Sequence, residues 1–278
     1  MSDGGEMIGA GRRPPGVTSM VGYRSMPAPG VVHRGLPSSK LVFIVSRDEG
    51  VVVDGLPANP VVLAGMHTAA SAIVTPTAQA GVQLAVHPLA ARALFGRPAA
   101  EIDVSTFGGV EQLGRRAVRL HERLTETRSW SSAFGAIEDD LLAAWDEDMI
   151  PRPELVQAWR LLENGASVAG TARAVGYSER RLQALFRAEF GCSPRTIAQL
   201  MRFERVTDLI ARWVAAGSVG FLADVAVTAG YSDQAHLTRE FRRFAGVTPG
   251  AWIVEEFANI QAGGHRRDGP SNHDDNDY

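Results

Sequence analysis

Two segments of the sequence carry side chains suited to binding nucleic acid. Residues 178–190 and 233–244 each place arginine and glutamine at helical spacing. Arginine can donate two hydrogen bonds to guanine, glutamine can pair with adenine, and a threonine methyl group can meet that of thymine. Each segment also has two large apolar residues four positions apart, Leu182 with Phe186 and Leu237 with Phe241. These pairs are expected to face a core, which turns the polar side chains outward.

The two segments belong to an internal repeat. Residues 172–178 (ARAVGYS) recur 54 positions later as residues 226–232 (AVTAGYS). Further along, five residues recur 55 positions later: Leu182, Phe186, Gly191, Ser193 and Pro194 become Leu237, Phe241, Gly246, Thr248 and Pro249. The second copy therefore has one more residue in its turn.

The repeated residues predict two pairs of helices. Gly176 and Gly230 can take the positive φ that ends a first helix in a tight turn, and Ala172 and Ala226 let the paired helices approach closely. Ser178 can cap the second helix of the first copy, and Ser232 or Asp233 that of the second. Gly191 and Gly246 would then end these helices, and Pro194 and Pro249 would start the next ones. A helical repeat protein is the alternative, but such a solenoid needs at least three units and the sequence has two.

The stretch from Ala223 to Pro249 resembles the C-terminal signature of the AraC/XylS family of bacterial transcription regulators, and the likeness extends over about residues 158–256. The resemblance implies an all-α domain at residues 153–257, with two helix-turn-helix units joined by a long helix at about residues 194–213. The reading helices would enter successive major-groove segments on one face of double-stranded DNA. RNA polymerase is the implied protein partner, and sequence-specific transcription regulation the implied function.

The resemblance also assigns roles to single residues. The first reading helix has Arg180, Gln183 and Ala184 at base-facing positions, where alanine departs from the polar residue often found. The second has base-facing or groove-facing Gln234, His236, Thr238 and Arg239. The remaining arginines are better suited to phosphate contacts, which position a protein without specifying sequence: Arg181, Arg187, Arg242 and Arg243. Any one of these arginines could instead belong to a solvated helix face.

Charge alone does not point to nucleic acid. The chain has a net charge of −3. Residues 151–260 contain 13 arginines, no lysine and 11 acidic residues, a balance of +2, whereas residues 261–278 have a balance of −2. So weak a positive balance is not a DNA-binding signature, and the prediction rests on the repeat.

The front half predicts an α+β protein with a small β-rich domain at residues 26–148. Five short apolar runs separated by turn residues predict an antiparallel sheet or incomplete barrel: residues 41–45, 51–53, 61–64, 72–74 and 82–86. Helices are expected from Pro88 and over residues 110–124 and 131–145. Residues 1–25, with their glycine and proline pairs, are expected to be a disordered arm, and residues 261–278 a disordered tail.

This front half resembles the β-rich domains that precede the DNA-binding part of many such regulators. A small-molecule sensor, a dimerisation unit or both are open roles for it. The apolar stripes of residues 110–124 and 131–145 could pair with a second copy of the chain, giving a homodimer, or could pack on their own sheet.

Other function classes lack their motifs. The sequence has no phosphate-binding loop, nucleophile elbow or His-Glu-x-x-His pattern, and its histidines have no metal-ligand spacing, so neither a cofactor, a metal nor an enzyme activity is expected. Its single cysteine, Cys192, excludes an internal disulfide and is expected to be an inert, packed thiol. No apolar run is long enough to span a membrane, which predicts a cytoplasmic protein. An enzyme site fused to a DNA-binding module, and a sequence-tolerant architectural DNA binder, are the alternatives.

Overall fold

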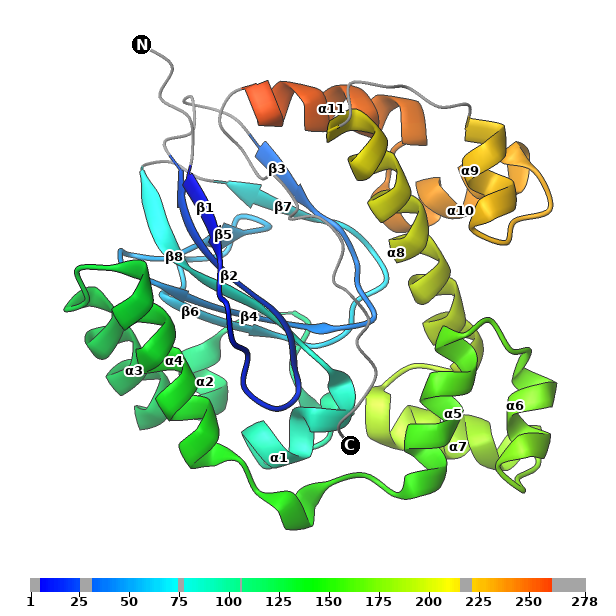
Figure 1. Ribbon diagram of the computed structural model, residues 1–278, viewed down its shortest axis with the longest axis horizontal. Coiled ribbons are helices and arrows are strands. Elements are labelled where there is room, and N and C mark those ends of the chain that lie inside the picture. The colour runs from blue at the N-terminus through cyan, green and yellow to red at the C-terminus, as the bar shows by residue number, and fades with distance from the viewer. Residues whose placement is uncertain (1–5, 26–31, 75–77, 106, 216–221, 262–278) are drawn as a thin grey trace.

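The computed structural model describes residues 6–25, 32–74, 78–105, 107–215 and 222–261. Within these ranges a β-rich half, residues 6–145, precedes a helical half, residues 153–261 (Figure 1). The predicted order of a β-rich part followed by an all-helical part is confirmed.

The strands of the β-rich half form two antiparallel sheets. The larger sheet has the order β1 (Glu6–Gly9), β2 (Val17–Ser25), β8 (Gln79–Val86), β4 (Leu41–Ser46) and β6 (Val61–Ala64). The smaller has the order β3 (Val32–Gly35), β7 (Ser71–Val74) and β5 (Val52–Val53). All five predicted strands are therefore present. Alternate residues of β4, Leu41, Phe43 and Val45, point into one core, and Ile44 on the opposite face packs into another, so this central strand is covered on both faces.

The predicted disordered arm is wrong for residues 6–25, which form β1 and β2; residues 1–5 lie outside the described ranges. A register shift between Val17 and Ser19, where β2 pairs with β8, breaks the alternation that marks a strand. Glycine is unfavourable in a strand. Position 22 nevertheless requires it, because the Trp130 ring packs on Gly22 and a Cβ atom would clash with that ring.

Helices cover one side of the larger sheet. After the short turn η1 (Pro88–Ala90) come α1 (Ala91–Phe95), η2 (Ala99–Glu101), α2 (Gly109–Leu113), α3 (Arg115–Thr125), α4 (Trp130–Ala144) and η3 (Glu147–Met149). The helix expected over residues 110–124 is divided at Gly114, which has a φ of +57°. Leu120 and Leu124 of α3 and Ile137 of α4 are fully buried in the same core as the sheet. The apolar stripes thus pack on their own sheet, although Val118, an apolar residue within the range 110–124, is exposed.

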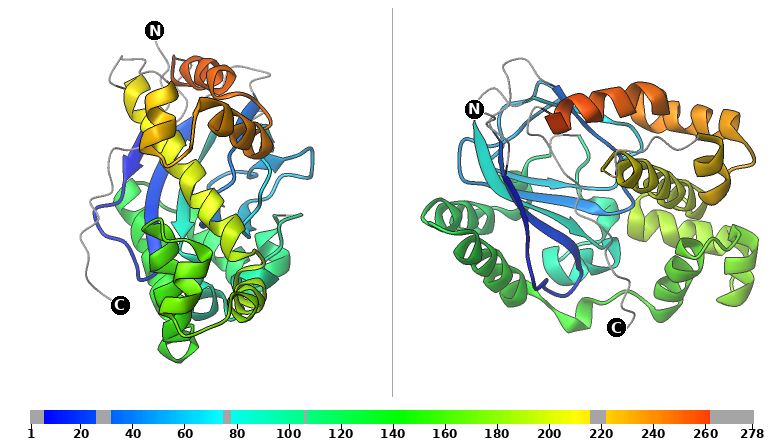
Figure 2. Two further views of the ribbon diagram at one scale, coloured as in Figure 1. Left: turned by 90° about the vertical axis from the view of Figure 1, so that its right-hand side faces the viewer. Right: turned by 45° about the horizontal axis from the view of Figure 1, so that its top comes forward.

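The helical half runs along the other side of the strands, as Figure 1 and the right-hand view of Figure 2 show. Its elements are α5 (Pro153–Glu163), α6 (Val168–Ala174), α7 (Glu179–Phe190), α8 (Pro194–Ala215), α9 (Leu222–Thr228), α10 (Gln234–Ala245) and α11 (Pro249–Gln261). The long helix predicted at residues 194–213 is α8. The predicted disordered tail falls on residues 262–278, outside the described ranges, except for Gln261, which ends α11.

One hydrophobic core joins the β-rich half to the first part of the helical half, and a second core lies within α8–α11. Trp159 of α5 is fully buried at the junction. Its ring packs against His87, with centroids 5.1 Å apart, and against Phe190 of α7, 5.0 Å away. The boundary between the β-rich half and the helical half, near residue 150, is therefore not a boundary between cores.

His87 is held in its neutral form at this junction. Its Nδ1 atom accepts a hydrogen bond from the backbone N–H of Leu89 at 3.1 Å, the cap of η1. Burial, aided by the positive charges of Lys40 and Arg160, lowers the pKa of His87 well below its ordinary value. Because the unfolded chain then binds a proton that the folded chain does not, lower pH favours unfolding.

We expect the free energy of unfolding to fall as the pH drops below about 6.5, the pKa of an unfolded histidine. His87 should contribute about 1.4 kcal/mol for each pH unit below that value. His87→Gln cannot titrate, so urea denaturation at pH 7.5 and 5.5 should show a smaller loss than in the wild type. His33 and His67 also have lowered pKa values through burial, so part of the slope should remain. An unchanged slope in His87→Gln would contradict this account.

Candidate nucleic-acid interface

The two copies of the sequence repeat fold into matching helical hairpins. The glycine in each turn has a positive φ, +73° at Gly176 and +83° at Gly230. The backbone N–H after it bonds back to the small residue of the first helix, Tyr177 to Ala172 at 2.9 Å and Tyr231 to Ala226 at 2.8 Å. These bonds satisfy carbonyl groups that a helix end leaves unpaired. The turn is thus the same in both copies.

The second helices of the hairpins, α7 and α10, have the same length and the same ends. Ser178 caps α7 by accepting from the N–H of Arg181 at 3.2 Å, and Asp233 caps α10 by accepting from the N–H of His236 at 2.7 Å. Of the two predicted caps for α10, Asp233 is the one used. Both helices have 12 residues and end at a left-handed glycine, Gly191 with φ +73° and Gly246 with φ +74°.

Most of the predicted contact residues lie on the outer faces of these helices. The apolar pairs Leu182 with Phe186 and Leu237 with Phe241 are buried, as predicted, and Leu185, the neighbour of Phe186 in the sequence, is half-buried. Eight predicted contact residues are exposed: Arg180, Arg181, Ala184, Arg187, Gln234, Arg239, Arg242 and Arg243. Among the described residues, none of these six arginines forms an ion pair. Their positive charge is therefore available to a polyanion.

The other three predicted contact residues, Gln183, His236 and Thr238, are half-buried. The His236 ring packs edge-on against Tyr231 with centroids 5.1 Å apart, and its Nδ1 atom lies 3.2 Å from the Ser232 hydroxyl. The Thr238 hydroxyl donates to the carbonyl of Gln234 at 2.8 Å. His236 therefore supports the start of α10, and Thr238 leaves its methyl group as its free contact atom.

The weak overall charge of the helical half hides an uneven distribution. Five of its acidic side chains are bound to partners away from the outer faces of α7 and α10: Glu163, Glu189, Glu204, Glu240 and Glu255. Within the part of the chain that the structure describes, the arginines of those outer faces form no ion pair with a carboxylate. Net charge averaged over the sequence therefore understates the positive potential of this surface.

A buried carboxylate anchors α10. Glu240 of α10 accepts hydrogen bonds from Arg202 of α8 at 2.8 and 3.0 Å, from the Tyr231 hydroxyl at 2.8 Å, and from the Gln199 amide at 3.1 Å. Burial and the charge of Glu240 raise the pKa of Tyr231, which keeps the phenol protonated as a donor. With this many donors the buried charge is satisfied.

The same network orients one of the predicted phosphate contacts. The Gln199 side chain, which donates to Glu240, accepts from the Arg243 guanidinium at 3.0 Å. That guanidinium also lies over the Phe244 ring, 4.4 Å from its centroid. Sequence reasoning missed Gln199, Arg202 and Glu240. The available signal was a carboxylate on the core-facing side of α10, between Leu237 and Phe241.

The described residues also bear on three other kinds of feature: a reactive thiol, a metal site and a membrane-spanning helix. Cys192 is a half-buried free thiol whose pKa is raised by burial, which disfavours the nucleophilic thiolate. No group of three or more histidine, cysteine, aspartate or glutamate side chains in the described part is arranged to hold a metal ion. In the same part, no helix is both long and apolar enough to cross a membrane.

We expect Glu240→Ala to lower the free energy of unfolding by about 3 kcal/mol, because it leaves the Arg202 guanidinium and the Tyr231 hydroxyl without their acceptor. Urea denaturation followed by circular dichroism measures this. Glu122→Ala, at an exposed residue of α3, is the control and should change stability by less than about 0.5 kcal/mol. A loss below about 1 kcal/mol in Glu240→Ala would mean that the network does not anchor α10.

Comparison with known proteins agrees with this geometry. Residues 171–253 match a family model described as a helix-turn-helix domain. No curated protein matches the sequence.

A transcriptional regulator with an AraC-type DNA-binding domain from Chromobacterium violaceum is similar in structure, at 24% identity over 39% of this chain and 92% of its own, with a TM-score of 0.33. ToxT from Vibrio cholerae is similar at 10% identity over 91% of this chain and 99% of its own, with a TM-score of 0.49. The C-terminal domain of AraT, a response regulator from Geobacillus stearothermophilus, is similar at 16% identity over 44% and 96%, with a TM-score of 0.34. Residues 171–253 of this chain are therefore a helix-turn-helix domain.

Proposed function

We propose that this chain is a sequence-specific transcription regulator that places α7 and α10 in two successive major-groove segments of double-stranded DNA. The observation that carries the proposal is the match between these two capped helices, each with an anchored inner face and exposed arginines on its outer face. A major groove admits one such helix, and two helices joined by α8 suit two segments on one face of the DNA.

The outer-face residues divide into two roles under this proposal. Arg180 and Gln183 on α7, and Gln234 and Arg239 on α10, lie in the N-terminal part of each helix, which is the part that contacts base edges in helix-turn-helix proteins. Arg243 lies at the other end, where Gln199 and Phe244 hold its guanidinium in one orientation. A fixed cation in that place suits a phosphate, which positions the helix.

The β-rich half would supply the regulatory input. It shares its core with the first helix-turn-helix unit, so a small molecule or a second copy of the chain bound there would act on a body that includes α7. RNA polymerase would be the partner through which the bound protein changes transcription. A sequence-tolerant architectural role is the second candidate, favoured by the single alanine at base-facing position 184.

Selection of bound fragments from the source genome by the full-length chain tests the proposal. A regulator should enrich a few fragments and give a short, defined footprint on each. Its affinity for them should exceed that for random DNA by about 10³-fold or more. Binding that depends on DNA length and not on sequence would instead favour the architectural role. Affinity should fall steeply with salt in either case, because phosphate contacts release counterions.

Two arginines of α10 should separate base reading from phosphate binding. Arg239→Ala should cost about 1–3 kcal/mol on the selected site and relax discrimination at one base position, whereas Arg243→Ala should weaken selected and random DNA alike and make the salt dependence less steep by about one ion. Fluorescence anisotropy on selected and scrambled DNA, over a range of salt, gives both quantities. Arg123→Ala, at an exposed arginine of α3 in the β-rich half, is the charge-matched control. Equal weakening of both DNAs by Arg239→Ala would contradict the assigned register of α10.

A further inference from the structure

The first reading helix ends against the β-rich half. Glu189, in the last turn of α7, is buried and accepts two hydrogen bonds from the Nε atom of Arg92 in α1, at 2.8 and 3.1 Å. One residue beyond the helix, Gly191 lies beside Ala100 of η2, close enough that a Cβ atom at 191 would be 3.4 Å from the Ala100 Cα atom. The C-terminal end of α7 is therefore fixed by residues that are far away in the sequence.

The second reading helix ends against the same half, at a different place. The N–H of Ala70 donates to the carbonyl of Phe244 at 2.8 Å, and Arg34 of β3 donates to the carbonyl of Ala245 at 3.0 Å. These carbonyls belong to the last turn of α10, where a helix leaves such groups without internal partners. Arg34 also pairs with Glu255 of α11 through hydrogen bonds of 2.9 and 3.1 Å.

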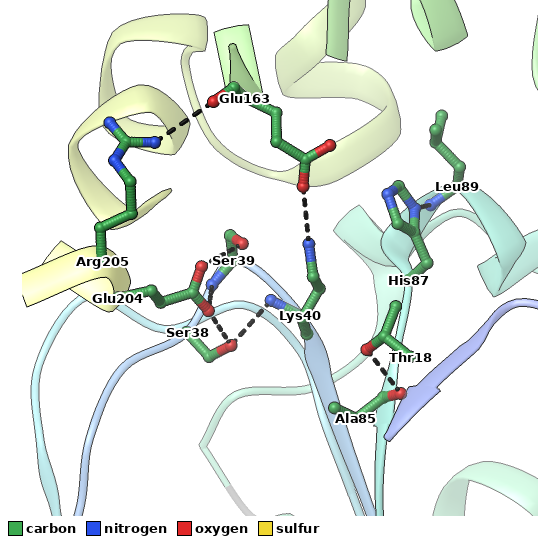
Figure 3. A network of polar contacts seen from close by, with 10 residues as sticks. All are labelled: Thr18, Ser38, Ser39, Lys40, Ala85, His87, Leu89, Glu163, Glu204 and Arg205. Carbon is green, nitrogen blue, oxygen red and sulfur yellow. Dashed lines mark hydrogen bonds and ion pairs between the residues drawn. The ribbon is translucent and has the colours of Figure 1, made fainter. Parts of the chain in front are cut away.

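The helix between the two units is held as well (Figure 3). Glu204 of α8 accepts hydrogen bonds from the Ser38 hydroxyl at 2.5 Å, the Ser39 backbone N–H at 2.9 Å and the Ser39 hydroxyl at 2.6 Å. Next to them, the Lys40 ammonium group lies 3.5 Å from a carboxylate oxygen of Glu163 in α5. We call these three sets the docking contacts: Arg92 with Glu189, Ser38 and Ser39 with Glu204, and Arg34 with Ala245 and Glu255.

The docking contacts avoid the residues that would read bases. They engage the C-terminal ends of α7 and α10, whereas Arg180 and Gln183 on α7, and Gln234 and Arg239 on α10, lie in the N-terminal parts of the helices and form none of these contacts. A domain that blocked DNA would be expected to cover those N-terminal parts. In this structure Arg180, Gln234 and Arg239 are exposed and Gln183 is half-buried. The docking contacts hold α7 and α10 at their C-terminal ends, away from these residues.

We propose, resting on the proposed function, that the β-rich half sets the relative position of the two reading helices and so determines which spacing of the two DNA segments the chain accepts. Arg34, Ser38, Ser39 and Arg92 are the positioning residues.

The helix α8 alone would leave two units joined at one place, and long helices bend. Contacts at both helix ends and at α8 restrict that bending. Each base pair inserted between the segments moves the second one by about 3.4 Å and turns it by about 35°, which a restrained pair of helices cannot follow.

The test measures spacing preference with the full-length chain. The DNA is the site selected from the genome, together with versions carrying one or two base pairs inserted or deleted between the two protected segments. The variant is Arg34→Ala/Arg92→Ala, which removes the arginine contacts at both helix ends and keeps the backbone hydrogen bond from Ala70 to Phe244. The control is Arg24→Ala/Arg123→Ala, which removes the same charge from two exposed arginines of the β-rich half that do not contact the helical half.

Wild type and control should lose about tenfold or more in affinity for each altered spacing, comparable to a mismatched base pair. For Arg34→Ala/Arg92→Ala, the affinity for each altered spacing should fall less than about threefold below that for the unaltered site, because the helices of this variant can adjust to the new spacing. A purely structural role would lower the melting temperature without changing the ratio between spacings. Should this variant not fold, as judged by circular dichroism, Ser38→Ala/Ser39→Ala removes the two hydroxyl donors to Glu204, leaves only the Ser39 backbone N–H there, and should also flatten the spacing preference.

Two results would overturn the inference. An unchanged spacing penalty in the folded variant would mean that Arg34 and Arg92 do not position the two helices for a given spacing. Tighter binding of the variant to the unaltered site would mean that the docking contacts inhibit DNA binding. Failure of the wild type to enrich any sequence would instead refute the proposed function, so the two failures are distinguishable.

Discussion

The packing of Trp159 joins the two halves of the chain, and the rest of the structure depends on it. The indole is fully buried between His87 of the β-rich half and Phe190 of α7, and the Lys40 ammonium group lies 5.6 Å from the ring centroid. Deletion of a side chain this large from a core costs several kcal/mol, which is a large part of the stability of a typical domain. The first helix-turn-helix unit is thus packed as part of the β-rich body, and its reading helix takes its position from that body.

The two units are stabilised in different ways although their backbones match. The second unit has its own core and the buried Glu240–Arg202 pair, so α10 is anchored within the helical half. The corresponding position in the first unit is Leu185, and the buried carboxylate of α7 is Glu189, whose partner Arg92 lies in the β-rich half. A change in the β-rich half would therefore reach α7 directly, and α10 through α8 and Arg34.

Acidic and basic side chains of the helical half are separated by side. Carboxylates such as Glu163, Glu204 and Glu255 bind groups of the β-rich half, whereas the arginines on the outer faces of α7 and α10 remain without ion pairs among the described residues. These contacts with the β-rich half compensate the negative charges on that side of the helical half. This separation lets a half with a charge balance of only +2 present its exposed arginines together on one side.

The sequence by itself determined the features that depend on neighbouring residues. Positive-φ glycines such as Gly176 and Gly230, the cap Ser178, and the apolar spacing of Leu237 and Phe241 act within one or two helical turns, so their residue types are sufficient to predict the hairpins. The sequence left the cap of the last hairpin open between Ser232 and Asp233, and the structure uses Asp233. The outward face of each reading helix follows from the same spacing.

Tertiary structure decided what depends on residues distant in the sequence. The strand β2 is stable because it pairs with β8 and because Gly22 admits the Trp130 ring, and neither partner is near it in the chain. Glu240 is tolerated in a core because Arg202 and Tyr231 surround it, and Glu189 because Arg92 reaches it from 97 residues away. A local pattern records which side chains turn inward. It does not record which partner each will meet there, because that partner is supplied by the packing of the whole chain.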